Sequence, residues 1–146
     1  IYLKTAKKFS LDELELLIPS WWLQQTCTPH FIHFQSPYSW QCHLRYEESN
    51  KNAQDILIQE LALKKIIMDE DQIIKNNFPN KLGPSFSFER TEGTGTKNEE
   101  ERVYIDLLVI KKNQKTWIMS SESAVLSGCV EGPYFEEMIT RLKCTS

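Results

Sequence analysis

The stretch Val103-Tyr104-Ile105-Asp106-Leu107-Leu108-Val109-Ile110 decides the fold of this chain. Successive side chains of a β-strand point to opposite faces, and both alternating sets in this stretch are apolar apart from Asp106. A strand that is apolar on both sides is typical of the centre of a sheet that is covered on both faces. We therefore expect a sheet with other elements packed against each face.

Two shorter strand patterns flank this stretch. Phe86–Arg90 precedes it across the polar segment Gly93–Glu101, which we interpret as an exposed hairpin loop. Thr116–Ser120 follows it across the polar turn Lys111–Lys115. The second half of the chain is therefore predicted to be an antiparallel meander of strands.

An earlier hairpin is predicted from the same alternation. Phe31–Phe34 and Trp40–Tyr46 alternate apolar and polar residues, and Gln35–Ser39 between them has the length of a hairpin turn. The apolar face of the second strand carries Trp40, Cys42, Leu44 and Tyr46.

The segment before this hairpin has two interpretations. Ser10 and Glu13 have the spacing of a helix capping box, which predicts a short helix over Leu11–Ile18. Leu14–Ile18, ending at Pro19, is equally consistent with a strand. A window of this length does not separate the two.

Two helices are predicted. Apolar residues over Ala53–Ile67 recur at helical spacing after the capping candidates Ser49, Asn50 and Asn52. The following Gln72–Lys75 suits a short strand or a further helical turn.

The second predicted helix opens at Gly132-Pro133 and runs to about Lys143. Glu136 and Glu137 would then lie in its first turn, where carboxylates complement the helix dipole. No repeat or linker divides residues 1–146, so we expect one domain. Its class is predicted to be α+β, with helices packed on the faces of a mostly antiparallel, twisted sheet.

Composition limits the classes of partner. The net charge of −3 argues against nucleic-acid binding, which needs clustered lysine and arginine. No apolar stretch reaches the ~20 residues that span a bilayer, and no signal peptide is visible, so we expect a soluble protein without membrane insertion. Because the chain starts at Ile1, removal of a leader leaves its compartment open: cytoplasmic or exported.

The cysteines are expected to be reduced and buried rather than joined in disulfides, because a chain of 146 residues can build a sufficient core without them. There are four, which allow three pairings: Cys27, Cys42, Cys129 and Cys144.

A metal site is the most tempting chemical hypothesis in this region, because Cys27, His30 and His33 are followed by Cys42 and His43. On an extended strand, however, His30 and His33 point to opposite faces and cannot bind one ion together. His33 and His43 can still meet across the hairpin. We expect partly exposed histidines and no metal, which elemental analysis of the purified protein would test.

No catalytic motif stands out. Cys42 and Cys129 lack the flanking signature of a thiol nucleophile, and the loop Gly93–Thr96 lacks the register of a phosphate-binding loop. Asp106 is either a buried acid with a raised pKa or an edge-facing or hydrogen-bonded strand residue. We therefore expect that the protein is not an enzyme and has neither catalytic residues nor a cofactor.

The tryptophans divide into two groups. Trp40 and Trp117 lie in alternating strands and are predicted to be core residues. Trp21 and Trp22 are adjacent, so in extended chain they cannot both face the core, and one of them is a candidate contact residue.

The order of these motifs resembles that of PsbP-like domains. The resemblance rests on Ile18–Trp22, His33–Pro37 and Trp40–Arg45, followed by a helix, a three-strand segment and the C-terminal helix Tyr134–Lys143. The order of motifs is similar in particular to that of a bacterial branch of this superfamily whose function is not established. The resemblance implies an α/β/α sandwich and action through protein surfaces, as in photosystem accessory subunits and a partner of a nuclear-transport GTPase.

These observations favour a non-enzymatic protein-binding or accessory module that uses Trp21 and Trp22, a sheet edge or the Gly93–Glu101 loop. The alternative is a small-molecule-binding domain or modest hydrolase. Its pocket would lie between sheet and helix, near Cys42, His43 and Asp106.

Overall fold

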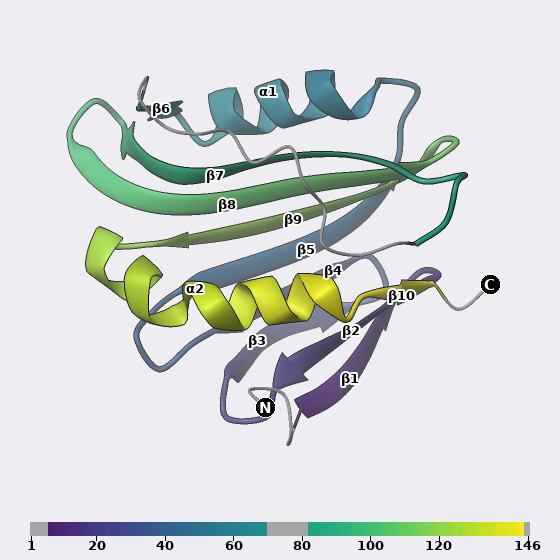
Figure 1. The fold of residues 1–146 in the computed structure, drawn as a ribbon, viewed down its shortest axis with the longest axis horizontal. Helices are drawn as coiled ribbons and strands as arrows, with labels where there is room; N and C mark the ends of the chain where they lie inside the picture. The colour runs from purple at the N-terminus through teal and green to yellow at the C-terminus, as the bar shows by residue number, and fades with distance from the viewer. Residues whose placement is uncertain (1–5, 70–81, 145–146) are drawn as a thin grey trace.

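A long curved sheet forms the centre of the protein (Figure 1). The structure, a computed structural model, describes residues 6–69 and 82–144, apart from the side chains at 25 and 129–131. Every neighbouring pair of strands in this sheet is antiparallel. The order across the sheet is β3 (Leu23–Thr28), β4 (Phe31–Gln35), β5 (Gln41–Glu48), β9 (Lys115–Ser123), β8 (Glu101–Lys112), β7 (Ser87–Lys97) and β6 (Ile66–Met68).

The strand β8 lies inside this sheet, as its two-sided apolar pattern predicts. It pairs with β7 on one side and β9 on the other, and both faces of its middle section are buried. The predicted α+β class with a mostly antiparallel sheet is therefore confirmed.

One face of the sheet is covered by α1 (Ala53–Leu63). Asn52 caps this helix, because its side chain accepts a hydrogen bond of 2.8 Å from the Asp55 amide. The prediction that the helix continues to Ile67 is wrong. Lys65 adopts a positive φ of 57°, which ends the helix, and the chain then turns directly into β6.

The other face of the sheet is covered by α2 (Val125–Thr140) and by a small three-stranded sheet. The small sheet has the order β1 (Ala6–Leu11), β2 (Leu14–Pro19), β10 (Lys143–Cys144). Helices therefore lie on both sides of the large sheet. No helix in the described part of the chain is long and apolar enough to cross a membrane.

The strand interpretation of Leu14–Ile18 is confirmed, and the capping-box helix is wrong. Leu14, Leu16 and Ile18 alternate as buried residues of β2, whereas Ser10 pairs with Glu15 inside the β1–β2 hairpin. A period of two buries every second side chain against the core, which a single turn of helix at this position cannot do.

The predicted start of the last helix is wrong. α2 begins at Val125, so Pro133 lies inside it and Glu136 is far from its first turn. Gly128 explains how the early part of the helix packs, since a Cβ there would come within 2.4 Å of the Tyr104 ring. Local sequence marks Gly128 as unfavourable in a helix, but the close approach of α2 to the sheet requires a residue without a side chain at this position.

The expected Gly93–Glu101 loop is also wrong. The hairpin between β7 and β8 extends to the pair Lys97–Glu101, and its turn is Asn98–Glu100. A Cβ on Gly95 would lie 2.7 Å from the carbonyl oxygen of Ile67, so this glycine admits the neighbouring strand β6. The polar segment is strand because β6 and β8 provide pairing partners that local sequence does not reveal.

The structure tests the predictions on the segment 72–75 and on the cysteines only in part. Gln72–Lys75 and the Cys129 side chain lie outside the described residues. Within the described ranges, Cys27, Cys42 and Cys144 are free thiols; Cys42 is buried and Cys27 is exposed.

Candidate functional site

A buried ion network connects the sheet to α2. Arg90 of β7 donates from Nε and Nη2 to the two carboxylate oxygens of Asp106 on β8, at 2.9 and 2.6 Å. Its Nη2 also lies 2.5 Å from Glu136 Oε2 on α2. Burial raises the pKa of Asp106 to about 6, against the hydrogen bonds and charge of Arg90. Asp106 is thus both buried and hydrogen-bonded, and both of its oxygens are engaged by the arginine.

The residues of the alternative pocket do not form one group. Cys42 and Asp106 both pair with Ser121 and therefore share the α2 face of the sheet, whereas His43 points to the opposite face. Burial, followed by the charge of Asp106, raises the pKa of Cys42 to about 12. A thiol with that pKa carries almost no thiolate near neutral pH, so Cys42 lacks the form that attacks electrophiles.

His33 and His43 meet across the β4–β5 hairpin, as the sequence allows. The expectation that His30 and His33 share one extended strand is wrong, because His30 lies in the turn between β3 and β4. The rings of His33 and His43 stack with their centroids 4.2 Å apart, and His30 contacts Tyr46 on the opposite face. Burial, then His33 and Lys64, lower the pKa of His43 to about 4. No group of three or more histidine, cysteine or acidic side chains in the described ranges is arranged to hold a metal ion.

The tryptophans behave as the sequence predicts. Trp40 and Trp117 are completely buried, and Trp117 Nε1 donates a 2.9 Å hydrogen bond to the carbonyl of Leu11. In the adjacent pair, Trp22 is buried at 5% exposure and Trp21 is 44% exposed. The pair therefore presents one ring to the core and one to solvent.

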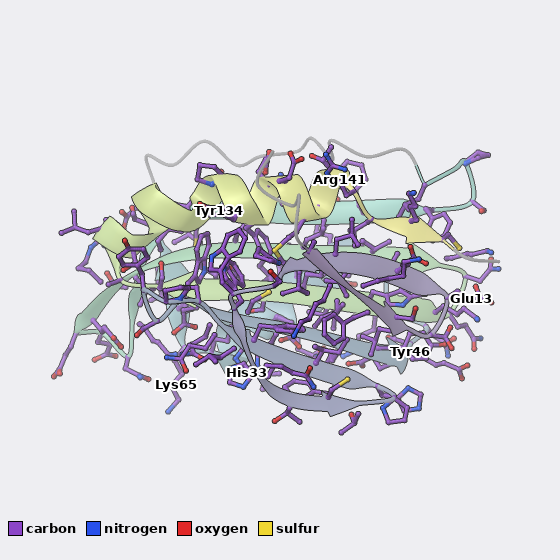
Figure 2. The ribbon with its side chains drawn as sticks, turned by 90° about the horizontal axis from the view of Figure 1, so that it is seen from below. Glu13, His33, Tyr46, Lys65, Tyr134 and Arg141 are labelled. Carbon is purple, nitrogen blue, oxygen red and sulfur yellow. The ribbon has the colours of Figure 1, made fainter. Side chains whose placement is uncertain are left out.

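Trp21 is held in place by neighbouring groups. It lies inside the turn Pro19–Trp22, in which the Trp22 amide donates to the Pro19 carbonyl at 3.1 Å. The Tyr134 ring of α2 packs edge-on against both tryptophans, with centroid distances of 5.8 Å to Trp21 and 6.4 Å to Trp22. Figure 2 shows Tyr134 on α2, on the side of the molecule away from Glu13. The exposed ring is therefore supported by a fixed aromatic partner.

Strand register defines the end of the sheet at which Trp21 lies. Leu23, Gln35, Gln41 and Glu122 follow one another in a row of paired residues across β3, β4, β5 and β9. The β2–β3 turn, the β4–β5 turn and the start of α2 all lie beyond this row, at one end of the sheet.

We call this region the aromatic end, and define it by four exposed apolar side chains. They are Trp21 (44% exposed), Leu23 (66%), Tyr38 (62%) and Leu126 (81%). The sequence indicated Trp21 and Trp22 together as contact residues, and the structure leaves only Trp21 exposed. Tyr38 could have been found from its place in the predicted turn 35–39, whereas the places of Leu23 and Leu126 at the same end of the sheet depend on how β3 and α2 are arranged.

The comparisons with known proteins show the fold alone. No family model and no curated protein matches the chain. A solved structure from Bacteroides thetaiotaomicron is similar over 96% of this chain, with a TM-score of 0.57 and 16% identity. This chain spans 48% of that protein.

A second solved structure is protein PA94 of Pseudomonas aeruginosa, described as a protein of unknown function and a candidate regulator. It is similar over 93% of this chain and 94% of its own length, with a TM-score of 0.55 and 14% identity. At these identities the similarity establishes a shared architecture and no shared activity.

Proposed function

We propose that this chain is a non-enzymatic protein-binding or accessory module whose partner docks on the aromatic end. The observation that carries the proposal is that four exposed apolar side chains, from three separate segments of the chain, lie at the same end of the large sheet. Exposed apolar surface that gathers in one region of a protein marks an interaction surface more often than single exposed apolar residues do.

The geometry of Trp21 suits an interface anchor. Tryptophan and tyrosine are enriched among the residues that dominate binding energy, and each can bury on the order of 150–250 Å². The Tyr134 ring packs against Trp21, and the turn at Pro19 orders its backbone, so part of the ordering cost of binding is already met in the free protein.

The remaining polar groups of the sheet favour a binding role over catalysis. Asp106 is engaged by Arg90 through both oxygens, and Cys42 is a buried thiol with a raised pKa. Neither group is placed to exchange protons with, or to attack, a molecule in solvent.

The resemblance to PsbP-like domains supports the same proposal. Helices on both faces of the large sheet are compatible with the α/β/α sandwich that this resemblance implies. Members of that superfamily act mostly through protein surfaces. We propose a bacterial branch of this superfamily as the family of the chain.

Site-specific photocrosslinking in the native host tests the proposal. A photoreactive phenylalanine analogue replaces Tyr38 at the aromatic end or, as a matched control, Ile58, an equally exposed apolar residue of α1. We expect one discrete crosslinked protein from position 38 and none from position 58. Adding Trp21→Ser to the position-38 protein should abolish that product, because the anchor is lost.

The proposal fails if the same product forms from position 58, if it survives Trp21→Ser, or if position 38 yields no product. Thermal unfolding serves as the folding control. Since Trp21 is partly exposed, its replacement should leave most of the stability intact.

A further inference from the structure

A cavity of about 710 Å³ lies at the end of the sheet opposite the aromatic end. Its walls come from β2, the segment 82–86 before β7, the last residue of β8, and the C-terminal end of α2 with β10. At this end of the sheet, β8 pairs with β7 through Lys111 and Ser87, and with β9 through Lys112 and Lys115. The pair Tyr104 and Ser123 lies at the other end of β8 and β9, near the aromatic end. The cavity and the aromatic end are therefore separate surfaces.

The floor of the cavity is apolar and firmly packed. Leu142 is buried, and Leu17, Leu82 and Phe86 pack against the core beneath it. The Phe86 ring lies 6.1 Å from the ring of the fully buried Trp117. These contacts preform an apolar surface of the kind that lines ligand pockets, and the volume falls within the roughly 300–1,000 Å³ typical of such pockets.

The polar part of the lining is basic. Lys112, Arg141 and Lys143 line the cavity, and no carboxylate is among the lining residues in the described ranges 6–69 and 82–144. Lys112 places its Nζ 5.5 Å from the centroid of the Phe86 ring, so charge and apolar floor are adjacent.

These cations come from two different walls. Arg141 and Lys143 follow the C-terminus of α2, where basic residues also complement the helix dipole, but Lys112 belongs to β8 and has no such role. Each of the three cations has an acidic neighbour outside the lining: Glu137 lies 2.8 Å from Arg141, Glu13 lies 4.0 Å from Lys112, and Glu15 of β2 is paired with Lys143 of β10. The charged side chains that line the cavity in the described part of the chain are nevertheless cations.

We propose that this cavity binds an aliphatic carboxylate, with the carboxylate near the basic lining and the hydrocarbon chain on the Phe86 floor. Charge complementarity selects the headgroup, because a guanidinium such as Arg141 matches the planar geometry of a carboxylate. The apolar floor selects the chain, which leaves water on binding. A ligand that lacks either the carboxylate or the hydrocarbon chain should bind more weakly.

Isothermal titration calorimetry with the full chain tests this assignment. The probe is decanoate below its micellar concentration. Acetate supplies the headgroup without the chain, and decyltrimethylammonium supplies the chain with the opposite charge. We expect decanoate to bind one site per chain and the other two probes to bind at least about tenfold more weakly.

Two variants locate the site. The double variant Arg141→Gln/Lys143→Gln should weaken decanoate binding by about tenfold or more, whereas Lys51→Gln/Lys65→Gln removes the same charge from other parts of the surface and should leave it unchanged. Ser85→Phe leaves every charge in place and should reduce binding by filling the cavity.

The assignment is overturned if decanoate gives no binding, if all three probes bind alike, or if the two charge variants have the same affinity. Trp21→Ser separates this site from the proposed protein interface. Unchanged decanoate affinity in that variant is expected, and its loss would place the bound decanoate at the aromatic end instead.

Discussion

The two faces of the large sheet are made from the same strands but are filled with different chemistry. The α1 face is aliphatic where the helix covers it, with a core of Ala53, Ile56, Ile66, Val103, Ile105, Leu107, Val109 and Ile118. The α2 face contains Trp40 and Trp117 together with the buried charges of Arg90 and Asp106.

The difference follows from how much of each face is covered. α2 and the small sheet together cover the second face, so a polar group there has no water and must find its partner in the protein. On the α1 face the ion pair of Glu60 lies at the margin, since its partner Arg45 is partly exposed. An ion pair on the α2 face should therefore contribute far more to the free energy of unfolding than the Arg45–Glu60 pair on the α1 face.

Removing one carboxylate from each face should show this difference between the two ion pairs. Asp106→Asn leaves the buried Arg90 guanidinium with Glu136 as its remaining carboxylate and should cost about 3–5 kcal/mol of unfolding free energy. Glu60→Gln should cost about 1 kcal/mol or less, because Arg45 also contacts Glu47 and reaches solvent. Urea unfolding measures both, and equal losses would contradict the contrast between the faces.

Two glycines of α2 test how closely that helix approaches the sheet. Gly128→Ala should cost about 1–3 kcal/mol, because its Cβ would meet the Tyr104 ring at 2.4 Å. Gly132→Ala should change stability by less than about 1 kcal/mol, since its Cβ would meet neighbours only at 3.9 Å or more. Thermal unfolding of the pair checks this, and a tolerated Gly128→Ala would mean that α2 can move away from the sheet.

The pH dependence of stability should report on the α1 face. His43 has a pKa of about 4 in the fold, against ~6.5 in an unfolded chain, so between these values the unfolded state binds more protons. Stability is then complete above about pH 6.5 and falls as the pH drops toward 4. The contribution should be on the order of 1 kcal/mol, because the ring is only partly buried and solvent screens it.

His43→Phe keeps a ring beside His33 and removes this titration. Urea unfolding of both proteins at about pH 7 and about pH 4.5 should show a smaller acid loss for the variant. An identical loss in the two proteins would assign the acid sensitivity to other groups.

The smallest expected effects concern the starts of the two helices. Asn52→Ala removes the side-chain cap of α1 and should cost about 1 kcal/mol. Ala124, at the same position before α2, makes no side-chain cap, so Ala124→Asn should add up to about 1 kcal/mol. Opposite shifts in the thermal midpoint are expected, and a destabilising Ala124→Asn would show that this helix start does not accept a cap.

Much of the fold could be predicted because it depends on local periodicity. The central strand β8, the β4–β5 hairpin and the body of α1 each show a clear period of two or of 3.6 residues. The start of α2 could not be predicted, since Gly128 and Pro133 are unfavourable inside a helix, and the close packing of α2 on Tyr104 that requires Gly128 is a tertiary contact. The length of the β7–β8 hairpin depended in the same way on pairing with β6.

The candidate sites were predictable only in part. The division of Trp21 and Trp22 between solvent and core follows from their adjacency, and so did the meeting of His33 with His43. The sequence did not indicate the basic cavity, because Lys112 and Arg141 come together through the packing of α2 and β10 against the sheet.

The sequence by itself determined which side chains share a face of each strand, because alternation is a property of the local backbone. It thereby determined that β8 is buried on both sides and that Trp117 of β9 belongs to the core. Only the tertiary structure decided what covers each face and which turns meet at each end. Those outcomes depend on long-range strand register and helix packing, which bring together residues that no local pattern relates.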